Sequence, residues 1–312
     1  MNSQAGIAVA LNIAGSVFFA LLFALTGLLT NVSGTEIYGW RMLFTFPALT
    51  LLVLNRGGWF QIVAIVRRVR VAPGFGLTRL LSAALIGFQL WLFVWAPGNG
   101  YALAVSLGYF AMPIGMVVIG RIAFKDRLST PQKAACLFAL IGVINQFVVS
   151  PTLAWPIWAV ALGYPVYFWL RRRTGTDHIG GLWCDMALSL PLSIWFIVQG
   201  GAVIGPLEAR AGMMATILGL GVVSALGLGC QSLSAPYLNL SLFGLLVYVE
   251  PVLLLIVALL FGDTIAPTEW PTYIAIWLAV LMLMAEGITS LRKQRSGRER
   301  QSRNDAIQSP TP

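Results

Sequence analysis

Charged residues are scarce in this sequence: only 10% of its 312 residues are Asp, Glu, Lys or Arg, whereas 58% are hydrophobic. A water-soluble domain cannot bury so large a share of apolar side chains, so the composition excludes a soluble enzyme and indicates a membrane protein. A helix needs about 20 apolar residues to cross a bilayer. The chain therefore has room for about ten such helices and for no soluble domain of useful size.

Cysteine and histidine are also scarce, and their spacing excludes two kinds of site. Cys136, Cys184 and Cys230 stand apart in apolar segments, which is typical of packing residues rather than of a disulfide framework. His178 is the single histidine and has no second His or Cys at metal-ligand spacing, so we expect no metal. The sequence also lacks a P-loop, an H-E-x-x-H and a G-x-S-x-G motif. We therefore expect no cofactor and no enzymatic activity of a familiar kind.

Long apolar runs bounded by Gly, Pro, Asn or charge make up most of the chain. Lipid cannot satisfy open backbone polar groups, so we expect these runs to be helices. The first run lacks a basic start and a signal-peptide cleavage site, which predicts an uncleaved span. The predicted fold is an all-α membrane protein with ten transmembrane helices, at about residues 6–29, 36–54, 78–96, 101–123, 131–149, 153–170, 179–199, 212–233, 239–261 and 269–289.

Basic residues divide unequally between the predicted loops. If the N-terminus is cytosolic, 18 of the 20 lysines and arginines fall in cytosolic loops or in the C-terminal tail, including Arg79 and Arg171 to Arg173. Arg210 alone falls on the outer side, and Arg41 lies within the span 36–54. This bias predicts a multi-pass inner (plasma) membrane protein with both termini cytoplasmic. The net charge of +9 then reflects orientation and contact with membrane lipid, and no nucleic-acid partner is expected.

The two halves of the chain resemble each other. Arg41 and Pro47 are six residues apart, as are Asp185 and Pro191, at a common offset of 144. Two later spans carry the segments Tyr-Phe-Ala-Met-Pro113 and Tyr-Val-Glu-Pro251, and each is followed by a Phe-x-Asp triplet. Five spans per half is an odd number, so the second copy must be inverted in the membrane, as in many secondary transporters. The predicted units are a first five-helix repeat at 1–149, a second inverted repeat at 150–290 and a disordered basic tail at 291–312.

The motifs resemble those of RarD-type permeases, in the EamA branch of the drug/metabolite transporter superfamily. The resemblance covers about residues 6–290 and rests on Glu36…Arg41, Ser106-Leu-Gly-Tyr-Phe110 with Pro113, Lys125-Asp126-Arg127, Asp185 with Pro191, and Tyr248, Pro251 and Gly262-Asp263. It implies a transporter of a small solute. The chain departs from the family pattern at several polar positions that would line a cavity, namely Gln89, Ala104, Met112, Tyr237, Val247 and Glu250.

Three ionisable residues within spans are the main candidates for substrate binding or coupling, because burying a charge in a membrane costs several kcal/mol and calls for a partner or a cavity. Arg41 either binds an anionic solute group or extends outward to the headgroups. Asp185 is either a proton-coupling carboxylate or part of an ion pair with the arginines at 171–173. Glu250 lies in mid-span, where we expect a functional role.

Further candidates are neutral. Tyr109, Tyr248 and Gln89 either line the solute path or pack between helices. Pro113 and Pro251 each remove a helical hydrogen bond, and so act as hinges or as simple kinks.

The leading hypothesis is a secondary transporter of a small metabolite or drug-like solute that works by alternating access, with a proton as a candidate coupling ion. The alternatives are an intramembrane enzyme acting on a lipid-linked substrate, with Asp185 and Glu250 as acid and base, and an accessory membrane subunit. The sequence does not specify the solute, the direction of transport or the oligomeric state.

Overall fold

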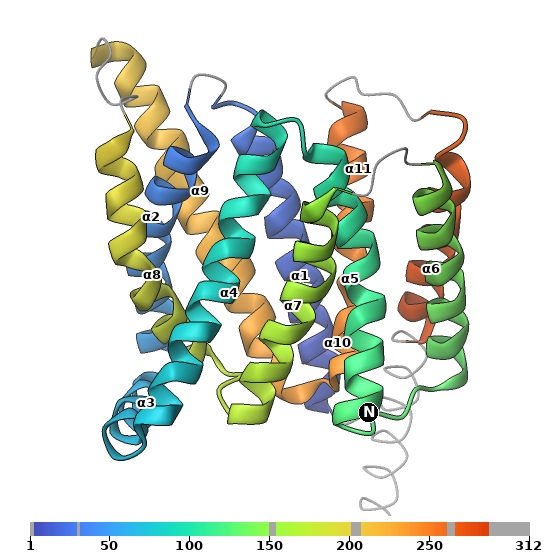
Figure 1. Cartoon of the computed structure of the whole chain (residues 1–312), viewed down its shortest axis with the longest axis horizontal. Coiled ribbons are helices and arrows are strands. Elements are labelled where there is room, and N and C mark those ends of the chain that lie inside the picture. Colours follow the sequence, from blue (N-terminus) through green and yellow to red (C-terminus); the bar gives the residue numbers. More distant parts are fainter. Residues whose placement is uncertain (1–2, 30–31, 150–153, 201–206, 261–265, 287–312) are drawn as a thin grey trace, which may run out of the picture.

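The computed structural model describes residues 3–29, 32–149, 154–200, 207–260 and 266–286, and within these ranges the chain is helical with no strand (Figure 1). The helices are α1 (Ser3–Thr26), α2 (Gly34–Asn55), α3 (Trp59–Val71), α4 (Pro73–Gly98), α5 (Ala102–Ala123), α6 (Thr130–Val149), α7 (Trp155–Thr174), α8 (Ile179–Gln199), α9 (Leu207–Ser234), the 3-10 turn η1 (Ala235–Tyr237), α10 (Leu240–Leu246) and α11 (Val249–Leu260). A further helix, Trp270–Glu286, follows α11.

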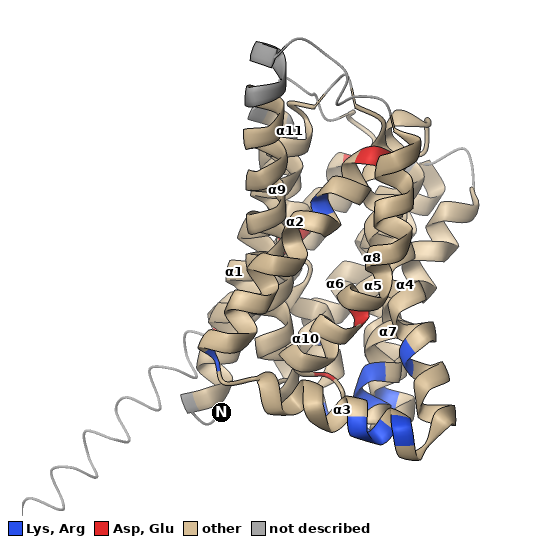
Figure 2. Cartoon of the chain, turned by 90° about the vertical axis from the view of Figure 1, so that its left-hand side faces the viewer, with Lys and Arg blue, Asp and Glu red and all other residues tan. Residues whose placement is uncertain are grey.

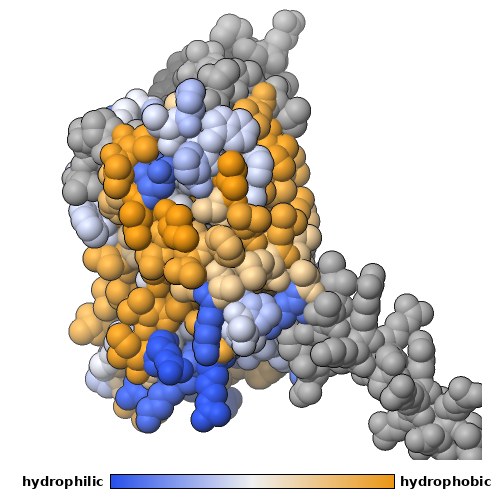
Figure 3. Space-filling model, turned by 90° about the vertical axis from the view of Figure 1, so that its right-hand side faces the viewer, coloured by the Kyte–Doolittle hydropathy of each residue, from blue (hydrophilic) through white to orange (hydrophobic). Residues whose placement is uncertain are grey.

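Eight helical segments of the described chain are long and apolar enough to cross a membrane: α1, α2, α4, α5, α6, α8, α9 and the α10–α11 pair. Helix α7 is also 20 residues long but has three arginines in its last turn, and Trp270–Glu286 is a shorter apolar helix. Large apolar side chains are exposed along α6, among them Leu137, Ile141 and Val148. The side view in Figure 3 shows such residues as a broad hydrophobic band above a hydrophilic end. The chain is therefore a multi-span α-helical membrane protein, as the composition predicts.

The helix ends follow local rules of sequence. Ser33 caps α2, because its hydroxyl accepts a hydrogen bond from the Glu36 N–H at 3.3 Å. The predicted break at Pro97-Gly98-Asn99-Gly100 is confirmed: α4 ends there, and Gly100 has a φ of 77°, which a side chain would disfavour. Helix α9 likewise ends just before Pro236.

The structure differs from the predicted spans in two places. An unpredicted helix, α3, occupies what the sequence suggested was a loop, and α4 begins at Pro73 rather than near residue 78. Arg79 is therefore a buried residue inside α4, and its predicted place in a cytosolic loop is wrong. The predicted continuous span 239–261 is interrupted between Leu246 and Val249, one turn before Pro251. Pro113, in contrast, lies inside the unbroken α5.

Close helix pairs bring the two halves of the chain together. Helix α5 packs on α7, and a side chain at Gly108 would meet the Val160 side chain at 2.6 Å and the Ile157 carbonyl at 2.9 Å. Helix α2 packs on α8, and a side chain at Gly39 would meet the Ser193 carbonyl at 2.7 Å. Small residues at such crossings allow the backbones to approach, which is how helices commonly associate in lipid.

Charge is concentrated at one end of the bundle, which we call the basic end. Figure 2 shows most of the Lys and Arg residues of the described chain there, around α3 and the end of α7. Arg67, Arg70 and Arg173 are exposed on this end. The opposite end holds the turn between α4 and α5.

Candidate solute-binding cavity

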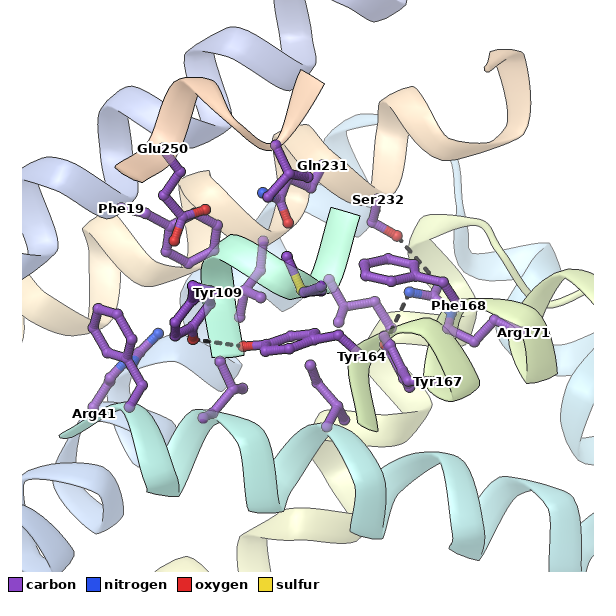
Figure 4. A pocket seen from close by; sticks show the side chains of 17 residues that line it. Phe19, Arg41, Tyr109, Tyr164, Tyr167, Phe168, Arg171, Gln231, Ser232 and Glu250 are labelled. Carbon is purple, nitrogen blue, oxygen red and sulfur yellow. Dashed lines mark hydrogen bonds between the residues drawn. The ribbon is translucent and has the colours of Figure 1, made fainter. Parts of the chain in front are cut away.

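A cavity lies in the interior of the bundle, between residues from both halves of the chain. It offers about 40 Å³ to the centre of a water molecule, which is room for only a few waters. Eight of the helices contribute to its wall, while α3, α6, α10 and Trp270–Glu286 do not. The lining residues are Phe19, Arg41, Ile86, Leu90, Phe93, Tyr109, Met112, Tyr164, Tyr167, Phe168, Arg171, Leu182, Leu228, Gln231, Ser232, Val247 and Glu250 (Figure 4).

Arg41 brings an incompletely satisfied cation to this cavity. Its side chain is 1% exposed, and its Nε donates to the Ser224 hydroxyl at 3.0 Å. Its Nη1 is buried and has no hydrogen-bond partner within the described ranges. The guanidinium lies 6.0 Å from the centre of the Phe93 ring. A buried guanidinium with a free donor can bind an anionic group, since its planar fork matches a carboxylate or phosphate.

Glu250 brings a carboxyl group to the same cavity. It sits in the first turn of α11, just after the break that follows α10, and its side chain points into the cavity (Figure 4). Among the described residues no side chain donates a hydrogen bond to its carboxyl group, and Arg41 is not within ion-pair distance of it. A guanidinium and a carboxyl group therefore face the same space without an ion pair between them.

Aromatic residues form much of the remaining wall. The hydroxyl groups of Tyr109 and Tyr164 are hydrogen-bonded to each other at 3.1 Å. The Phe93 and Tyr109 rings meet edge to face at 5.8 Å, and Tyr164 stacks on Phe168 at 6.4 Å between ring centres. These rings give the cavity apolar faces for a solute between polar groups at its ends.

Arg171 forms the floor of the cavity toward the basic end, and its predicted position in a loop is wrong. The side chain is 2% exposed in the last turn of α7. Its donors are satisfied by the carbonyls of Thr176 and His178, by the Tyr167 hydroxyl at 3.0 Å and by the Ser232 hydroxyl at 3.2 Å. Arg171 thus joins α7, the loop before α8, and α9, and these contacts use four of its five N–H donors.

Asp185 does not line the cavity, but it is hydrogen-bonded to Tyr167, which does. It pairs with Arg79 at 3.4 Å, in a contact whose side chains are 3% and 0% exposed. The carboxylate also accepts hydrogen bonds from Ser82 at 2.9 Å and from Tyr167 at 3.3 Å. The predicted ion pair therefore exists, but its partner is Arg79 of α4 rather than an arginine at 171–173. This pair is the only salt bridge within the part of the chain that the structure describes.

His178 ends the polar network outside the spans. Its Nδ1 accepts a hydrogen bond from the Gly181 N–H at 3.2 Å and so caps α8. Burial, with Arg171 nearby as a second cause, lowers the pKa of His178 below its ordinary value. The ring is therefore held in its neutral form, as a capping acceptor requires.

The structure brings three of the six predicted binding or coupling residues to one cavity, namely Arg41, Tyr109 and Glu250. The Gln89 amide donates to the Ala159 carbonyl at 2.7 Å, and Gln89 packs between α4 and α7. Tyr248 is fully buried, with its hydroxyl bonded to the Phe110 carbonyl at 2.9 Å.

Sequence reasoning missed the face of α7 that borders the cavity. Tyr164, Tyr167, Phe168 and Arg171 all line it. Their spacings of three, four and seven residues are those of one helix face, so this stripe was a usable signal.

A second pocket of about 290 Å³ opens toward the end opposite the basic end. Its lining includes Pro97, Ala102 and Pro251. It shares Phe93 and Tyr109 with the cavity, so this pair of rings separates the two spaces. These two rings thus border the cavity on one side, and Arg171, which is hydrogen-bonded to Tyr167, borders it toward the basic end.

A cavity lined by ionisable and aromatic side chains inside a bundle of membrane-spanning helices is typical of a solute transporter, and the comparisons with known proteins agree. The chain is 34% identical over 88% of its length to an uncharacterized transporter of Haemophilus influenzae, of which it covers 91%. It is 36% identical over 93% of its length to the chloramphenicol-sensitive protein RarD of Pseudomonas aeruginosa, of which it covers 97%.

The chain belongs to the RarD family of transporters. No family model matches it. One crystal structure that is 15% identical superposes with a TM-score of 0.64 over 93% of this chain and 99% of the other, which shows a shared fold.

Proposed function

We propose that the protein is a secondary transporter that carries a small metabolite or drug-like solute across the inner membrane by alternating access. The observation that carries the proposal is the cavity in which Arg41 and Glu250 face one space among aromatic rings. Burial of a guanidinium and of a carboxyl group without a direct pair is costly. A bound solute that contacts both groups offsets that cost.

The proposed architecture is ten membrane helices in two inverted repeats, one formed by α1, α2, α4, α5 and α6 and the other by α7, α8, α9, α10–α11 and Trp270–Glu286. The pattern of helix contacts supports this scheme. Helix α4 packs on α7 as α9 packs on α1, α2 packs on α9 as α8 packs on α4, and α5 packs on α7 as α11 packs on α1. Exchanging the halves therefore maps the two members of each of these three pairs of contacts onto each other.

A pair of polar contacts supports the same scheme at residue level. Arg41 of α2 donates to Ser224 of α9 at 3.0 Å, and Asp185 of α8 accepts from Ser82 of α4 at 2.9 Å. The two members of each pair have counterparts about 140 residues away in the other half. The repeat thus accounts for one charged residue near each end of the cavity.

The different borders of the cavity at its two sides support alternating access. The Phe93 and Tyr109 rings lie between the cavity and the pocket at one end, while an ion pair with several hydrogen bonds joins the helices at the basic end. We assign the basic end to the cytoplasm, because basic residues gather on the cytoplasmic side of membrane proteins. Both termini would then be cytoplasmic.

We propose that Arg41 binds an acidic group of the solute and that Glu250 binds and releases the coupling proton. A carboxyl group in a site with little water can exchange a proton when a partner approaches or leaves. The titratable or charged side chains that face Glu250 are Arg41 on α2, Tyr109 on α5 and Tyr164 on α7. Solute binding at Arg41 would change the charge that Glu250 faces, which links the two events.

Uptake into proteoliposomes with an imposed pH gradient tests the proposal. The solute panel contains small carboxylates, phosphates and neutral drugs, with chloramphenicol included because a relative is named for sensitivity to it. We expect at least one acidic solute to accumulate. We also expect Glu250→Gln to abolish the dependence on the gradient, whereas the control Glu269→Gln, outside the cavity, keeps it.

Failure of every solute to move in either direction would overturn the transport proposal. Transport that is equally gradient-driven in Glu250→Gln would remove only the coupling role. The enzyme hypothesis would need Asp185 and Glu250 to act on one substrate, but only Glu250 lines the cavity.

A further inference from the structure

A third hollow lies on the outside of the bundle, between α4 and α8, and is distinct from the central cavity and from the pocket at its end. This lateral groove has a volume of about 730 Å³ and is lined by Tyr38, Leu80, Ala83, Ala84, Gly87, Phe88, Trp91, Leu188, Ser189, Leu192 and Phe196. Leu80, Phe88, Leu188 and Leu192 are exposed. Since they lie within membrane-spanning helices, the groove opens to the bilayer rather than to water.

The groove is lined by no charged side chain and by few polar ones. Trp91 already donates to the Thr35 hydroxyl at 3.3 Å. Ser189 donates to the Asp185 carbonyl at 2.9 Å, and Ser193 behind it donates to the Ser189 carbonyl at 3.0 Å. These three donors are therefore used.

Tyr38 is the exception. Its side chain is 0% exposed, and its hydroxyl has no hydrogen bond of normal geometry in the described chain, although it faces Ser189 and Ser193. A Cβ atom at Gly87 would lie 3.2 Å from this hydroxyl. Because glycine has no side chain, nothing from position 87 stands between the hydroxyl and the groove. A buried hydroxyl without a partner costs about 1–3 kcal/mol, and a ligand acceptor would recover it.

The depth of this hydroxyl identifies the kind of acceptor. Ser189 and Gly87 are near the middle of α8 and α4, so Tyr38 presents its hydroxyl near the midplane of the bilayer. The hydrocarbon core is about 30 Å thick, which puts the ester carbonyls of phospholipids about 15 Å away. Phospholipid tails at the midplane carry no acceptor. The acceptor must belong to a molecule dissolved in the bilayer core.

We propose that the lateral groove binds an uncharged lipophilic molecule that carries a carbonyl group, with the Tyr38 hydroxyl donating to that carbonyl. Charged ligands are excluded because no lining residue offsets a charge. The apolar walls from α4 and α8 hold the body of the molecule. This binding does not depend on transport through the central cavity, since the two sites lie on different faces of α4: Gly87 borders the groove and Ile86 the cavity.

Photo-crosslinking with benzophenone tests the proposal in the purified full-length protein in lipid nanodiscs. Benzophenone is an uncharged ketone that inserts on illumination into C–H bonds close to its carbonyl. Peptide mass spectrometry should find the adducts on α4 near Gly87 and on α8 near Ser189. At subsaturating probe, Tyr38→Phe should lower these adducts about fivefold, the equivalent of one hydrogen bond, and Gly87→Leu should remove them.

Matched controls separate the site from general damage. Tyr237→Phe removes an exposed tyrosine hydroxyl elsewhere, and Gly219→Leu adds a side chain where nothing lies within 4 Å. Both should label like the unaltered protein. Adducts spread evenly over lipid-exposed helices such as α6, or unchanged labelling in Tyr38→Phe, would overturn the proposal. So would a phospholipid that co-purifies through the groove and is not displaced by benzophenone. Uptake assays measure the transport proposal separately.

Discussion

Replacement of Asp185 by asparagine tests whether the buried pair with Arg79 is structural or takes part in coupling. The substitution keeps the size of the side chain but removes the charge that faces the Arg79 guanidinium. Asp185 is 0% exposed and accepts from Arg79, Ser82 and Tyr167, all of which are donors. Leaving one member of a buried ion pair alone costs about 3–5 kcal/mol. The asparagine amide can accept from only some of the three donors, which adds to the loss.

We therefore expect Asp185→Asn to lower the free energy of unfolding by about 3–5 kcal/mol. The measurement is a denaturant titration in mixed micelles followed by circular dichroism. The double variant Arg79→Gln/Asp185→Asn should lose less than the sum of the single variants, because it leaves no uncompensated charge. A loss below about 1 kcal/mol for Asp185→Asn would refute the structural role. Unchanged stability together with lost transport would instead assign Asp185 to coupling.

Three further predictions concern other parts of the molecule. Arg41→Met should leave the melting temperature unchanged or raise it, because it removes a buried charge without an ion-pair partner. Uptake of an acidic solute by this variant should fall at least tenfold. A lowered melting temperature would mean that Arg41 stabilises the fold. Gly108→Leu should destabilise the α5–α7 contact by about 1–3 kcal/mol or more in the same denaturant titration, because Val160 and the Ile157 carbonyl occupy the space, and the open site Gly219→Leu provides the control.

The third concerns pH. The pKa of His178 is lowered in the folded protein, so the neutral ring stabilises the fold above its unfolded pKa of about 6.5 and that contribution is lost as pH falls through the folded value. His178→Asn keeps a capping acceptor that does not titrate, so melting temperatures recorded between pH 7.5 and 5 should fall less steeply than in the unaltered protein; an identical slope would show that other groups set it.

The helices could be predicted from the sequence because the membrane imposes a local rule. A run of about 20 apolar residues marks a span without knowledge of its neighbours. The local rule that places basic residues in loops failed for two arginines. Arg79 and Arg171 were assigned to loops because basic residues usually flank spans, yet each is buried and forms a hydrogen bond with a residue at least 60 positions away, Asp185 and Ser232 respectively. Contacts of that range follow from helix packing, which no local pattern encodes.

The candidate site shows the same limit. Arg41, Tyr109 and Glu250 were identified because polar residues in apolar helices are rare enough to stand out. Whether such a residue faces a cavity depends on the rotation of its helix, and Gln89 and Tyr248 face neighbouring helices instead. The aromatic stripe of α7 was overlooked because tyrosine and phenylalanine are common in membrane helices.

The Tyr167 hydroxyl serves two structures at once. It borders the solute cavity, and it donates one hydrogen bond to Asp185 while accepting another from Arg171. A solute acceptor that competes for this proton would take a donor away from the carboxylate of the buried pair. Loading of the cavity and strength of the seal at the basic end would then be reciprocally linked, each altering the other by the same free energy. In such a transporter, one hydroxyl group would both sense the bound solute and stabilise the contacts at the basic end.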